Sequence, residues 1–342
     1  MHLLLHIGPP KTGSTAIQKS LELNDDALKE AGILPMFYKA SKINTLPLQA
    51  LGVRHKSGRA LEQWPIPQNF KTPQAAHAWS DRHWKTLAET VKKSDADLCV
   101  ISSEHLGYGI GAPGLIADFR EIFSGITVLV YARDPASLYF SSMQQQLRSG
   151  KRLFQLRTPE NYAYRHRKEV EKYADAVGAE NVVVRNFSRD NLRDRDVVQD
   201  FFGEVERLGK TIKVDPVQAN ESIPGAALAL LMLINEATKP GEHPRQRMQL
   251  IKRIRESKSV AKLPSFPPEI PWVRTMIRAQ AAEDCAWLNE KFLSGQKLLT
   301  VETGPVPDYP GDDVWRATLR DAFMAYLTPE ALAVLGPEIV KT

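Results

Sequence analysis

Cysteine is scarce in this chain, with Cys99 and Cys285 the two among 342 residues. Two thiols supply neither a disulfide framework nor a zinc cluster, so disulfide-stapled scaffolds and zinc modules are excluded. Cys99 lies within an apolar run, which is typical of a small residue in the core. The fold must therefore depend on a hydrophobic core, and a chain of this length can build one.

Long hydrophobic runs are also missing. No apolar stretch reaches the roughly 18–20 residues that a helix needs to cross a bilayer. The N-terminal apolar run around Leu3 to Leu5 is ended by Gly8, too early for the core of a signal peptide. We therefore expect a soluble, cytoplasmic protein without stable membrane insertion.

Charge of one sign is in slight excess, with a net charge of +5 and a pI near 9.0. This excess suits an anionic ligand. A nucleic-acid binder would carry a denser basic patch with aromatic residues beside it. We therefore expect no nucleic-acid partner, and the oligomeric state cannot be read from the sequence.

Short apolar runs alternate with helical patterns over the first 190 residues, and the rest of the chain is mostly helical. This alternation predicts an α/β fold, a parallel sheet with helices on both faces. The predicted strands are 2–7, 98–101, 126–132 and 181–185. The predicted helices are 14–23, a short one after Asp25 that Gly32 ends, 75–93, 136–148, 159–177, 194–208, 224–238, 245–256, 270–294 and 312–335.

The domain organisation predicted from these patterns has two parts. Residues 1–210 form the α/β core, and residues 211–342 form a helical C-terminal cap of the same domain. Within the core, residues 35–95 are an acceptor-side insertion, because five prolines fall between positions 35 and 75 and the periodicity there is weak.

A candidate phosphate-binding loop follows the first predicted strand. Residues 8–15 read GPPKTGST, which has the length of a Walker A loop, but Ser14 stands where that loop has its lysine. Backbone amides and the N-terminus of the next helix can still bind a phosphate. The lysine that reaches the β- and γ-phosphates of a triphosphate is absent, while Lys11 can neutralise a leaving phosphate oxygen.

A second candidate anion site follows the strand at 126–132. Arg133 ends that strand, and Ser141 lies eight residues further along, within the next predicted helix. Arginine offers a planar fork that suits phosphate. The alternative is a surface ion pair between Arg133 and Asp134 on a polar helix face. Because both candidate sites fall at carboxyl ends of strands, they predict a nucleotide that carries two separate phosphates.

These residues resemble a known family. Residues 10–15, PKTGST, are similar to the 5′-phosphosulfate loop of sulfotransferases that use 3′-phosphoadenosine 5′-phosphosulfate (PAPS), and Arg133-Asp134-Pro135 with Ser141 is similar to their 3′-phosphate motif. The wider string at 6–18, HIGPPKTGSTAIQ, resembles the bacterial, carbohydrate sulfotransferase-like branch. The resemblance covers about residues 1–35 and 97–190.

The resemblance implies a P-loop NTPase-like fold, PAPS as sulfuryl donor, adenosine 3′,5′-bisphosphate as product, no required metal, and a glycan or glycolipid acceptor. The donor-binding residues that it implies are Lys11, Thr12, Gly13, Ser14, Thr15, Arg133 and Ser141. Two features of the cytosolic animal members are missing: their adenine-stacking tryptophan is replaced by Ala16, and their C-terminal arginine-lysine-glycine motif is not visible. Phe187 is a candidate for stacking on adenine or for the core.

A general base is expected where the strand at 98–101 ends, in the string Ser102-Ser103-Glu104-His105. If the backbone stays extended there, Glu104 and His105 point to opposite sides and one of them faces the loop. Related glycan and tyrosyl-protein sulfotransferases use a glutamate, which favours Glu104, with His105 as the other candidate. A helix-capping or salt-bridging role for Glu104 is the alternative.

Other residues are weaker candidates, and two other functions remain open. His55, the glutamines 144–146 and the basic stretch 245–255 could meet an acidic or sugar acceptor, or be ordinary polar surface. The first alternative function is a P-loop kinase of a small metabolite, which would need a lysine after Gly13. The second is a nucleotide-binding module without catalysis.

Overall fold

The computed structural model describes residues 1–36, 48–55, 70–107, 112–214, 223–238, 244–266 and 270–340. The chain forms two compact units that interleave along the sequence. The first holds Met1–Arg133, Arg165–Ala219 and Asp284–Leu299, and the second holds Asp134–Tyr164, Asn220–Glu283 and Thr300–Thr342. The boundaries of these units differ from the predicted boundary at residue 210 between the core and the cap. The assignment of both parts to one domain stays a prediction.

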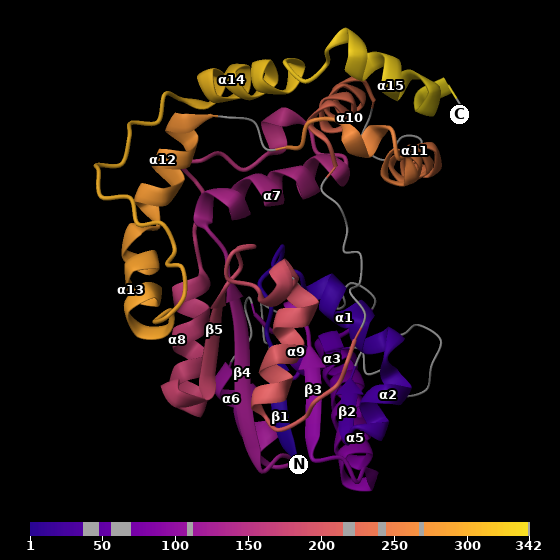
Figure 1. The fold of residues 1–342 in the computed structure, drawn as a ribbon, viewed down its shortest axis with the longest axis vertical. Coiled ribbons are helices and arrows are strands. Elements are labelled where there is room, and N and C mark those ends of the chain that lie inside the picture. The colour runs from indigo at the N-terminus through magenta and orange to yellow at the C-terminus, as the bar shows by residue number, and fades with distance from the viewer. Residues whose placement is uncertain are drawn as a thin grey trace. The chain divides into compact units, whose positions relative to one another are not determined.

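The first unit is built on a five-stranded parallel sheet in the order β2-β3-β1-β4-β5 (Figure 1). The central strand β1 is paired on both sides, with Leu4 opposite Val100 of β3 and Thr127 of β4. Leu4 is fully buried, as expected of a strand covered on both faces. The α/β class and parallel sheet are therefore confirmed. The strands are β1 His2–His6, β2 Ile33–Met36, β3 Leu98–Ser102, β4 Gly125–Ala132 and β5 Val182–Asn186.

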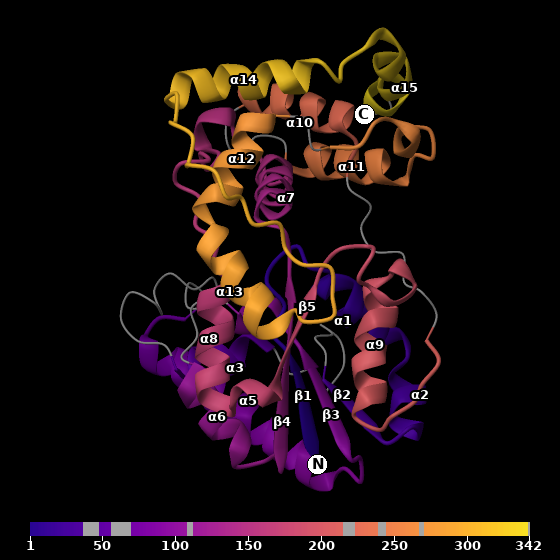
Figure 2. The same cartoon turned by 60° about the vertical axis from the view of Figure 1, so that its left-hand side comes forward.

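Helices cover both faces of this sheet. Helices α1, α2 and α9 lie on one face, and α3, α5, α6 and α8 lie on the other (Figure 2). The connection after β1 therefore runs to one face of the sheet, and the connections after β2 and β3 run to the other. Open α/β sheets bind ligands at the carboxyl ends of the strands, at the point where neighbouring connections diverge in this way. The helices are α1 Ser14–Leu23, α2 Asp25–Glu30, α3 Leu48–Val53, α5 Pro73–Lys93, α6 Ala112–Arg120, α8 His166–Val177 and α9 Val197–Arg207.

The core beneath α1 and α9 is apolar and closely packed. Ile17 and Leu21 of α1 pack with Phe201 and Val205 of α9 over Leu4 of β1. Burying each such side chain stabilises the fold by about 1.5–3 kcal/mol. This packing fixes the N-terminal end of α1 above the end of β1.

The second unit is helical and has its own hydrophobic core. Helix α10 supplies a continuous buried stretch, Ala226 to Ala229, and α7 contributes Phe140 and Met143. The mostly helical C-terminal part is therefore confirmed. The helices of this unit are α7 Pro135–Arg148, α10 Gly225–Ala237, α11 Pro244–Glu256, α12 Pro271–Gln280, α14 Asp312–Met324 and α15 Pro329–Val340, and α13 Ala282–Phe292 begins in it and continues into the first unit.

No helix in the described part of the chain is by itself long and apolar enough to cross a membrane. Helices α14 and α15 are long and apolar enough for this only when taken together, by length and composition alone. They are bent by 83° at the break between them.

The prediction of irregular structure between residues 35 and 75 is wrong at residues 35 and 36, which belong to strand β2. Strand β2 runs through Pro35, which a central strand would exclude for lack of an N–H donor. Because β2 lies at the edge of the sheet, the proline is tolerated. Helices α3 and α6 were also not predicted; α3 has six residues, too few for a helical period to be read. Much of the proline-rich stretch, 37–47 and 56–69, lies outside the described residues.

Two predicted helices begin later than expected. Helix α8 begins at His166 rather than 159, because the Thr158 hydroxyl accepts from Asn161 Nδ2 at 3.0 Å in a local turn. Helix α9 begins at Val197 rather than 194, because Asp194 is left-handed with φ 52°.

Two long predicted helices are each divided. The helix expected at 270–294 is interrupted at Ala281 between α12 and α13. The helix expected at 312–335 is interrupted at 325–328, because Pro329 disfavours helical backbone at Thr328. The Thr328 hydroxyl instead accepts from the Ala331 amide at 3.2 Å and caps α15.

Candidate functional site

The loop between β1 and α1 has an unusual backbone. Lys11 has φ 72° and Gly13 has φ 85°, so two left-handed residues alternate in one turn. Lys11 is not glycine, and such a conformation costs about 1–3 kcal/mol unless its surroundings hold it. The turn is closed by the Thr12 hydroxyl, which donates to the Pro9 carbonyl at 2.7 Å.

The loop presents unpaired backbone donors. The N–H groups of residues 12–15 donate to no acceptor within the described part of the chain. Gly13, at the N-cap of the ten-residue helix α1, offers no capping side chain. Successive amides around left-handed residues, together with a helix N-terminus, form an anion-binding concavity. The backbone of residues 8–15 is compatible with the predicted phosphate loop, and phosphate binding there stays a prediction.

Two buried polar side chains lie beneath the loop. His6 is fully buried, and its Nδ1 lies 2.8 Å from the Ser102 hydroxyl at the end of β3. Its Nε2 and the Oγ of Ser14 have no hydrogen-bond partner among the described residues. Leaving one such atom unpaired costs about 1–3 kcal/mol. Burial also lowers the pKa of His6 to about 3, so the imidazole is neutral near pH 7.

Gly8 is required by this arrangement. A Cβ placed on Gly8 would lie 2.2 Å from Ser14 Oγ and 2.7 Å from His6 Cε1, closer than real contacts allow. The glycine therefore leaves room for an imidazole and a hydroxyl under the loop. The sequence prediction missed His6; a histidine that closes an apolar strand just before such a glycine was the available signal.

Arg133 reaches the loop from the end of β4. Its Nη1 donates to the Lys11 carbonyl at 2.7 Å, and its guanidinium lies 5.5 Å from the centre of the Phe187 ring. A Cβ on Gly13 would meet Phe187 at 3.2 Å, so that ring also borders the loop. The structure thus brings Arg133, Lys11 and Phe187 together. Phe187 is half-buried and packs on the core of the first unit, and adenine stacking stays a prediction.

Ser141 lies on α7 in the second unit, whereas Arg133 belongs to the first unit and ends its first segment. The eight-residue gap spans the division between the units, so a joint anion site of Arg133 and Ser141 stays a prediction. Asp134 has other partners: it accepts from the Ser137 amide at 2.8 Å and pairs with Arg278 at 3.0 Å.

The segment that carries the candidate base lies beside the loop. Glu104 begins a 3₁₀ turn, Glu104–Leu106, with one residue between it and the end of β3 at Ser102, so the backbone does not stay extended at residues 104 and 105 and the condition for their pointing to opposite sides is not met. A Cβ on Gly107 would meet the Ile7 carbonyl at 3.2 Å, which brings this segment against the phosphate loop. Tyr173 of α8 secures the turn by donating to the Leu106 carbonyl at 2.5 Å. The side chain of His105 lies outside the described residues.

The predicted site residues differ in how far they are exposed to solvent. Thr12 and Ser14 are buried, Thr15 is exposed, and the others are half-buried: Lys11, Gly13, Glu104, Arg133 and Ser141.

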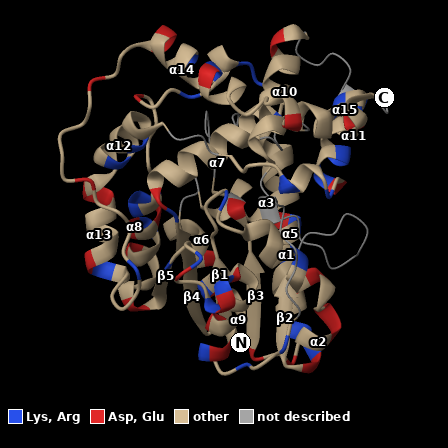
Figure 3. Ribbon diagram, turned by 45° about the horizontal axis from the view of Figure 1, so that its top comes forward, with Lys and Arg blue, Asp and Glu red and all other residues tan. Residues whose placement is uncertain are grey.

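The weaker candidates have structural partners. His55 Nε2 lies 2.7 Å from Asp118 Oδ2, and Gln144 donates to the Ile223 carbonyl at 3.1 Å from a buried position. Helix α11 carries the predicted basic stretch (Figure 3), but Arg247 donates to the Leu147 and Arg148 carbonyls at 2.6 and 2.9 Å. At least one arginine of the basic stretch is therefore used for contacts within the protein.

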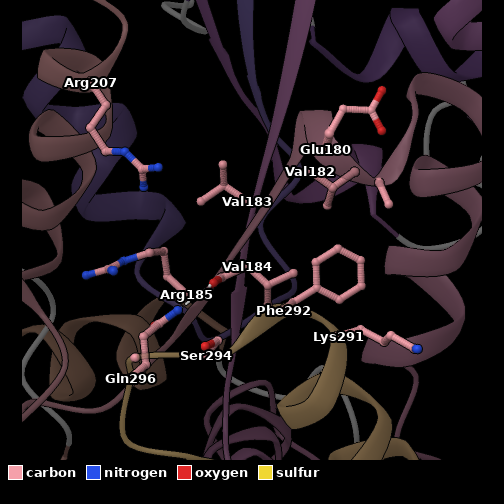
Figure 4. Close-up of a pocket in the computed structure, with 12 residues that line it drawn as sticks. Glu180, Val182, Val183, Val184, Arg185, Arg207, Lys291, Phe292, Ser294 and Gln296 are labelled. Carbon is pink, nitrogen blue, oxygen red and sulfur yellow. Dashed lines mark hydrogen bonds between the residues drawn. The ribbon is translucent and has the colours of Figure 1, made fainter.

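A separate pocket of about 580 Å³ lies at the outer edge of β5, lined by that strand, the turn before it and residues 291–296 (Figure 4). The Gln296 side chain donates to the Val184 carbonyl and accepts from the Asn186 amide, both at 3.0 Å, and so acts like a short neighbouring strand. Arg185 is paired with Asp200 at 2.5 Å. No predicted site residue lines this pocket.

In the comparison with known proteins, no family model, curated protein or solved structure matches this chain. Within the described residues, no group of three His, Cys, Asp or Glu side chains is arranged to hold a metal ion. The expected independence from metal stays a prediction.

Proposed function

We propose that this protein is a sulfotransferase that uses PAPS as donor and has a P-loop type of fold. One observation carries the proposal: a loop whose amides at residues 12–15 meet no acceptor among the described residues is held at Lys11 by Arg133, which comes from the neighbouring strand. The two elements that the sequence assigns to different phosphates of one nucleotide are therefore joined by a direct hydrogen bond. The orphaned polar atoms of His6 and Ser14 under the same loop support an anionic ligand.

The residues of the loop have distinct roles in this proposal. The amides of residues 12–15 hold the 5′-phosphate, and Lys11 neutralises charge on the bridging oxygen. Arg133 and Ser141 bind the 3′-phosphate. When bound, PAPS supplies an activated sulfuryl group whose S–O bond to phosphate breaks as a new S–O bond forms to the acceptor hydroxyl. Glu104 takes the acceptor proton.

Ser14 argues against transfer from a triphosphate. A Walker A lysine at this position would reach the β- and γ-phosphates, and a serine buried at 3% exposure cannot. A small-metabolite kinase is therefore disfavoured. The acceptor proposed from the family resemblance is a glycan or glycolipid, and the proposed location is the cytoplasm.

Thermal unfolding with ligands tests the function. Adenosine 3′,5′-bisphosphate at about one hundred times its dissociation constant should add roughly 2.7 kcal/mol of stability and raise the melting temperature. The shift should be lost in Arg133→Ala and kept in Arg82→Ala, a matched control because Arg82 is an exposed arginine on α5. A shift with magnesium-ATP alone would favour the kinase, and no shift with either would favour a module without this activity.

A further inference from the structure

The position of Glu104 depends on the backbone that carries it. The residue is half-buried, and its carboxylate makes no hydrogen bond or ion pair with another residue in the described part of the chain. No side-chain partner among those residues therefore holds the carboxylate in place. Its distance from a reacting group is set by the short segment after β3, and by whatever fixes that segment.

Two side chains bind the backbone on either side of Glu104. Gln18 Nε2 donates to the Ser102 carbonyl at 3.1 Å, two residues before the candidate base. The Tyr173 hydroxyl donates to the Leu106 carbonyl at 2.5 Å, two residues after it. Tyr173 is 1% exposed and Leu106 is fully buried, so water does not compete for this bond. Glu104 is therefore the midpoint of a segment that is bound at both ends.

The two side chains come from opposite faces of the sheet. Gln18 lies on α1 and Tyr173 lies on α8, and these helices cover different faces (Figure 2). Because α1 begins at the phosphate loop, the Gln18 bond ties the segment to the helix whose N-terminus borders the proposed donor site. The central strand β1 adds a third hold, since the Ser103 amide donates to the His6 carbonyl at 2.9 Å.

We propose that Gln18 and Tyr173 are positioning residues for Glu104, each acting through the backbone carbonyl that it binds. The inference rests on the proposed function, in which Glu104 takes the acceptor proton. A general base must lie within hydrogen-bond reach of that proton, and a displacement of about 1 Å can lower a rate by about 10²-fold. Loss of either bond lets the segment shift, which lowers turnover and leaves the phosphate loop in place.

Turnover per binding site tests the proposal. Tyr173→Phe and Gln18→Leu nearly keep the size of each side chain and remove its donor. Transfer from ³⁵S-labelled PAPS to a pool of methyl glycosides, or to water, gives kcat, and calorimetric titration with adenosine 3′,5′-bisphosphate counts the sites. Each variant should lower kcat by about 10- to 100-fold and keep the Kd of the bisphosphate within about twofold. A merely structural role would lower the number of folded sites and leave kcat per site unchanged.

Two matched controls lose the same kind of bond elsewhere. Tyr139→Phe removes a hydroxyl that donates to the Arg157 carbonyl at 2.7 Å, from a position that is 2% exposed. Gln199→Leu removes an amide that donates to the Val214 carbonyl at 3.0 Å. Both should keep kcat near the wild-type value. Controls that lowered kcat as much as the test variants would show a general loss of packing and overturn the proposal.

A Glu104→Gln background shows whether the two residues act through the base. Once the base is lost, adding Tyr173→Phe or Gln18→Leu should lower kcat by less than about twofold further. Losses that multiply would mean that these residues act elsewhere in the site, and they would overturn the proposal. Either single variant at the wild-type kcat would overturn it as well.

The wild type separates failure of this inference from failure of the function. A wild type that binds no bisphosphate, or that moves no label from PAPS to glycosides or water, overturns the sulfotransferase function and this inference with it. A wild type that turns over PAPS, with variants that keep its kcat, overturns this inference alone.

Discussion

Arg133 donates from Nη1 to the backbone carbonyl of Lys11 at 2.7 Å. The bond links the end of β4 to the one loop residue whose left-handed conformation, φ 72°, is costly without support. Arg133 therefore supports the shape of the candidate phosphate loop, in addition to the charge that the proposed function has it offer to the ligand. A residue that only bound a distant phosphate would have no such contact.

This contact predicts an effect on ligands that lack a 3′-phosphate. Arg133→Lys keeps the charge but loses the planar fork, and we expect it to weaken adenosine 5′-phosphate as well as the bisphosphate, each by about tenfold. Calorimetric titration of both ligands measures this. If adenosine 5′-phosphate bound the variant as it binds the wild type, Arg133 would serve the 3′-phosphate alone. Arg82→Ala is the control for a lost surface arginine.

Glu104 is predicted to matter for turnover and not for donor binding. Glu104→Gln keeps the size of the side chain and the 3₁₀ turn but cannot accept a proton, so it should lower kcat by about 10²- to 10⁴-fold. Affinity for adenosine 3′,5′-bisphosphate should stay within about twofold. Turnover near the wild-type rate would instead identify Glu104 as a capping or salt-bridging residue. Glu89→Gln, on α5, is the control for a lost carboxylate.

Gly8→Ala should damage the loop. The added methyl would lie 2.2 Å from Ser14 Oγ, and such overpacking costs about 1–3 kcal/mol of unfolding free energy. Gly336→Ala gives the opposite sign, because a Cβ there meets nothing within 4 Å and alanine favours the helix. Urea unfolding of both variants measures the difference. Equal stabilities would show that the loop can shift to accept the methyl.

The sheet was predictable because its strands are apolar and bounded by loops of distinct composition. Strands β1, β3, β4 and β5 were found, whereas β2 was hidden by Pro35, whose edge position cannot be read from local sequence. Helix boundaries failed where a side chain competes with the helix, as Thr158 does before α8. Local patterns therefore predicted which elements exist, while their ends depended on single hydrogen bonds.

The candidate site was predictable only in part, for a related reason. A motif read along the chain named Lys11 and Arg133 separately, but not the bond between them, because 122 residues separate them. His6 begins the string at 6–18 but was given no role there, and its place under the loop follows from the pairing of β1 with β3. Contacts between elements are set by the sheet order, which no single segment encodes.

Arg247 is predicted to stabilise the second unit. Its guanidinium donates to the carbonyls of Leu147 and Arg148, which end α7, and to Asn235 Oδ1. Arg247→Ala removes these bonds and should cost about 1.5–3 kcal/mol. The Leu147 carbonyl keeps the Asn235 Nδ2 and Gly150 amide as donors, so the loss falls mainly on the Arg148 carbonyl and Asn235 Oδ1. Arg245→Ala, an exposed position on the same helix, should be nearly neutral. Thermal unfolding of the two variants decides between this role and a purely surface role for α11.

Two buried histidines predict that stability falls in mild acid. Burial lowers the pKa of His6 and of His166 from 6.5 to about 3. Below pH 6.5 the unfolded chain takes up a proton at each, while the folded chain does not until pH nears 3. Stability is therefore fully present above pH 6.5 and falls by about 1.4 kcal/mol per pH unit for each histidine below it. Burial raises the pKa of Glu169 and Glu204 from 4.5, so the folded chain takes up these protons before the unfolded chain does. As the pH falls toward 4.5, these two glutamates therefore add stability and oppose the effect of the histidines.

Urea unfolding at pH 7.0, 6.0 and 5.0 measures this slope, since the window lies above the ordinary pKa values of carboxylates. His6→Phe removes one of the two protons taken up on unfolding and keeps a ring against Tyr131 and Phe201. The slope should then fall by about 1.4 kcal/mol per pH unit, whatever the change in stability at pH 7. A slope unchanged by His6→Phe would mean that His6 gains its proton while the chain is folded. That result would also remove the fixed, neutral imidazole from beneath the phosphate loop.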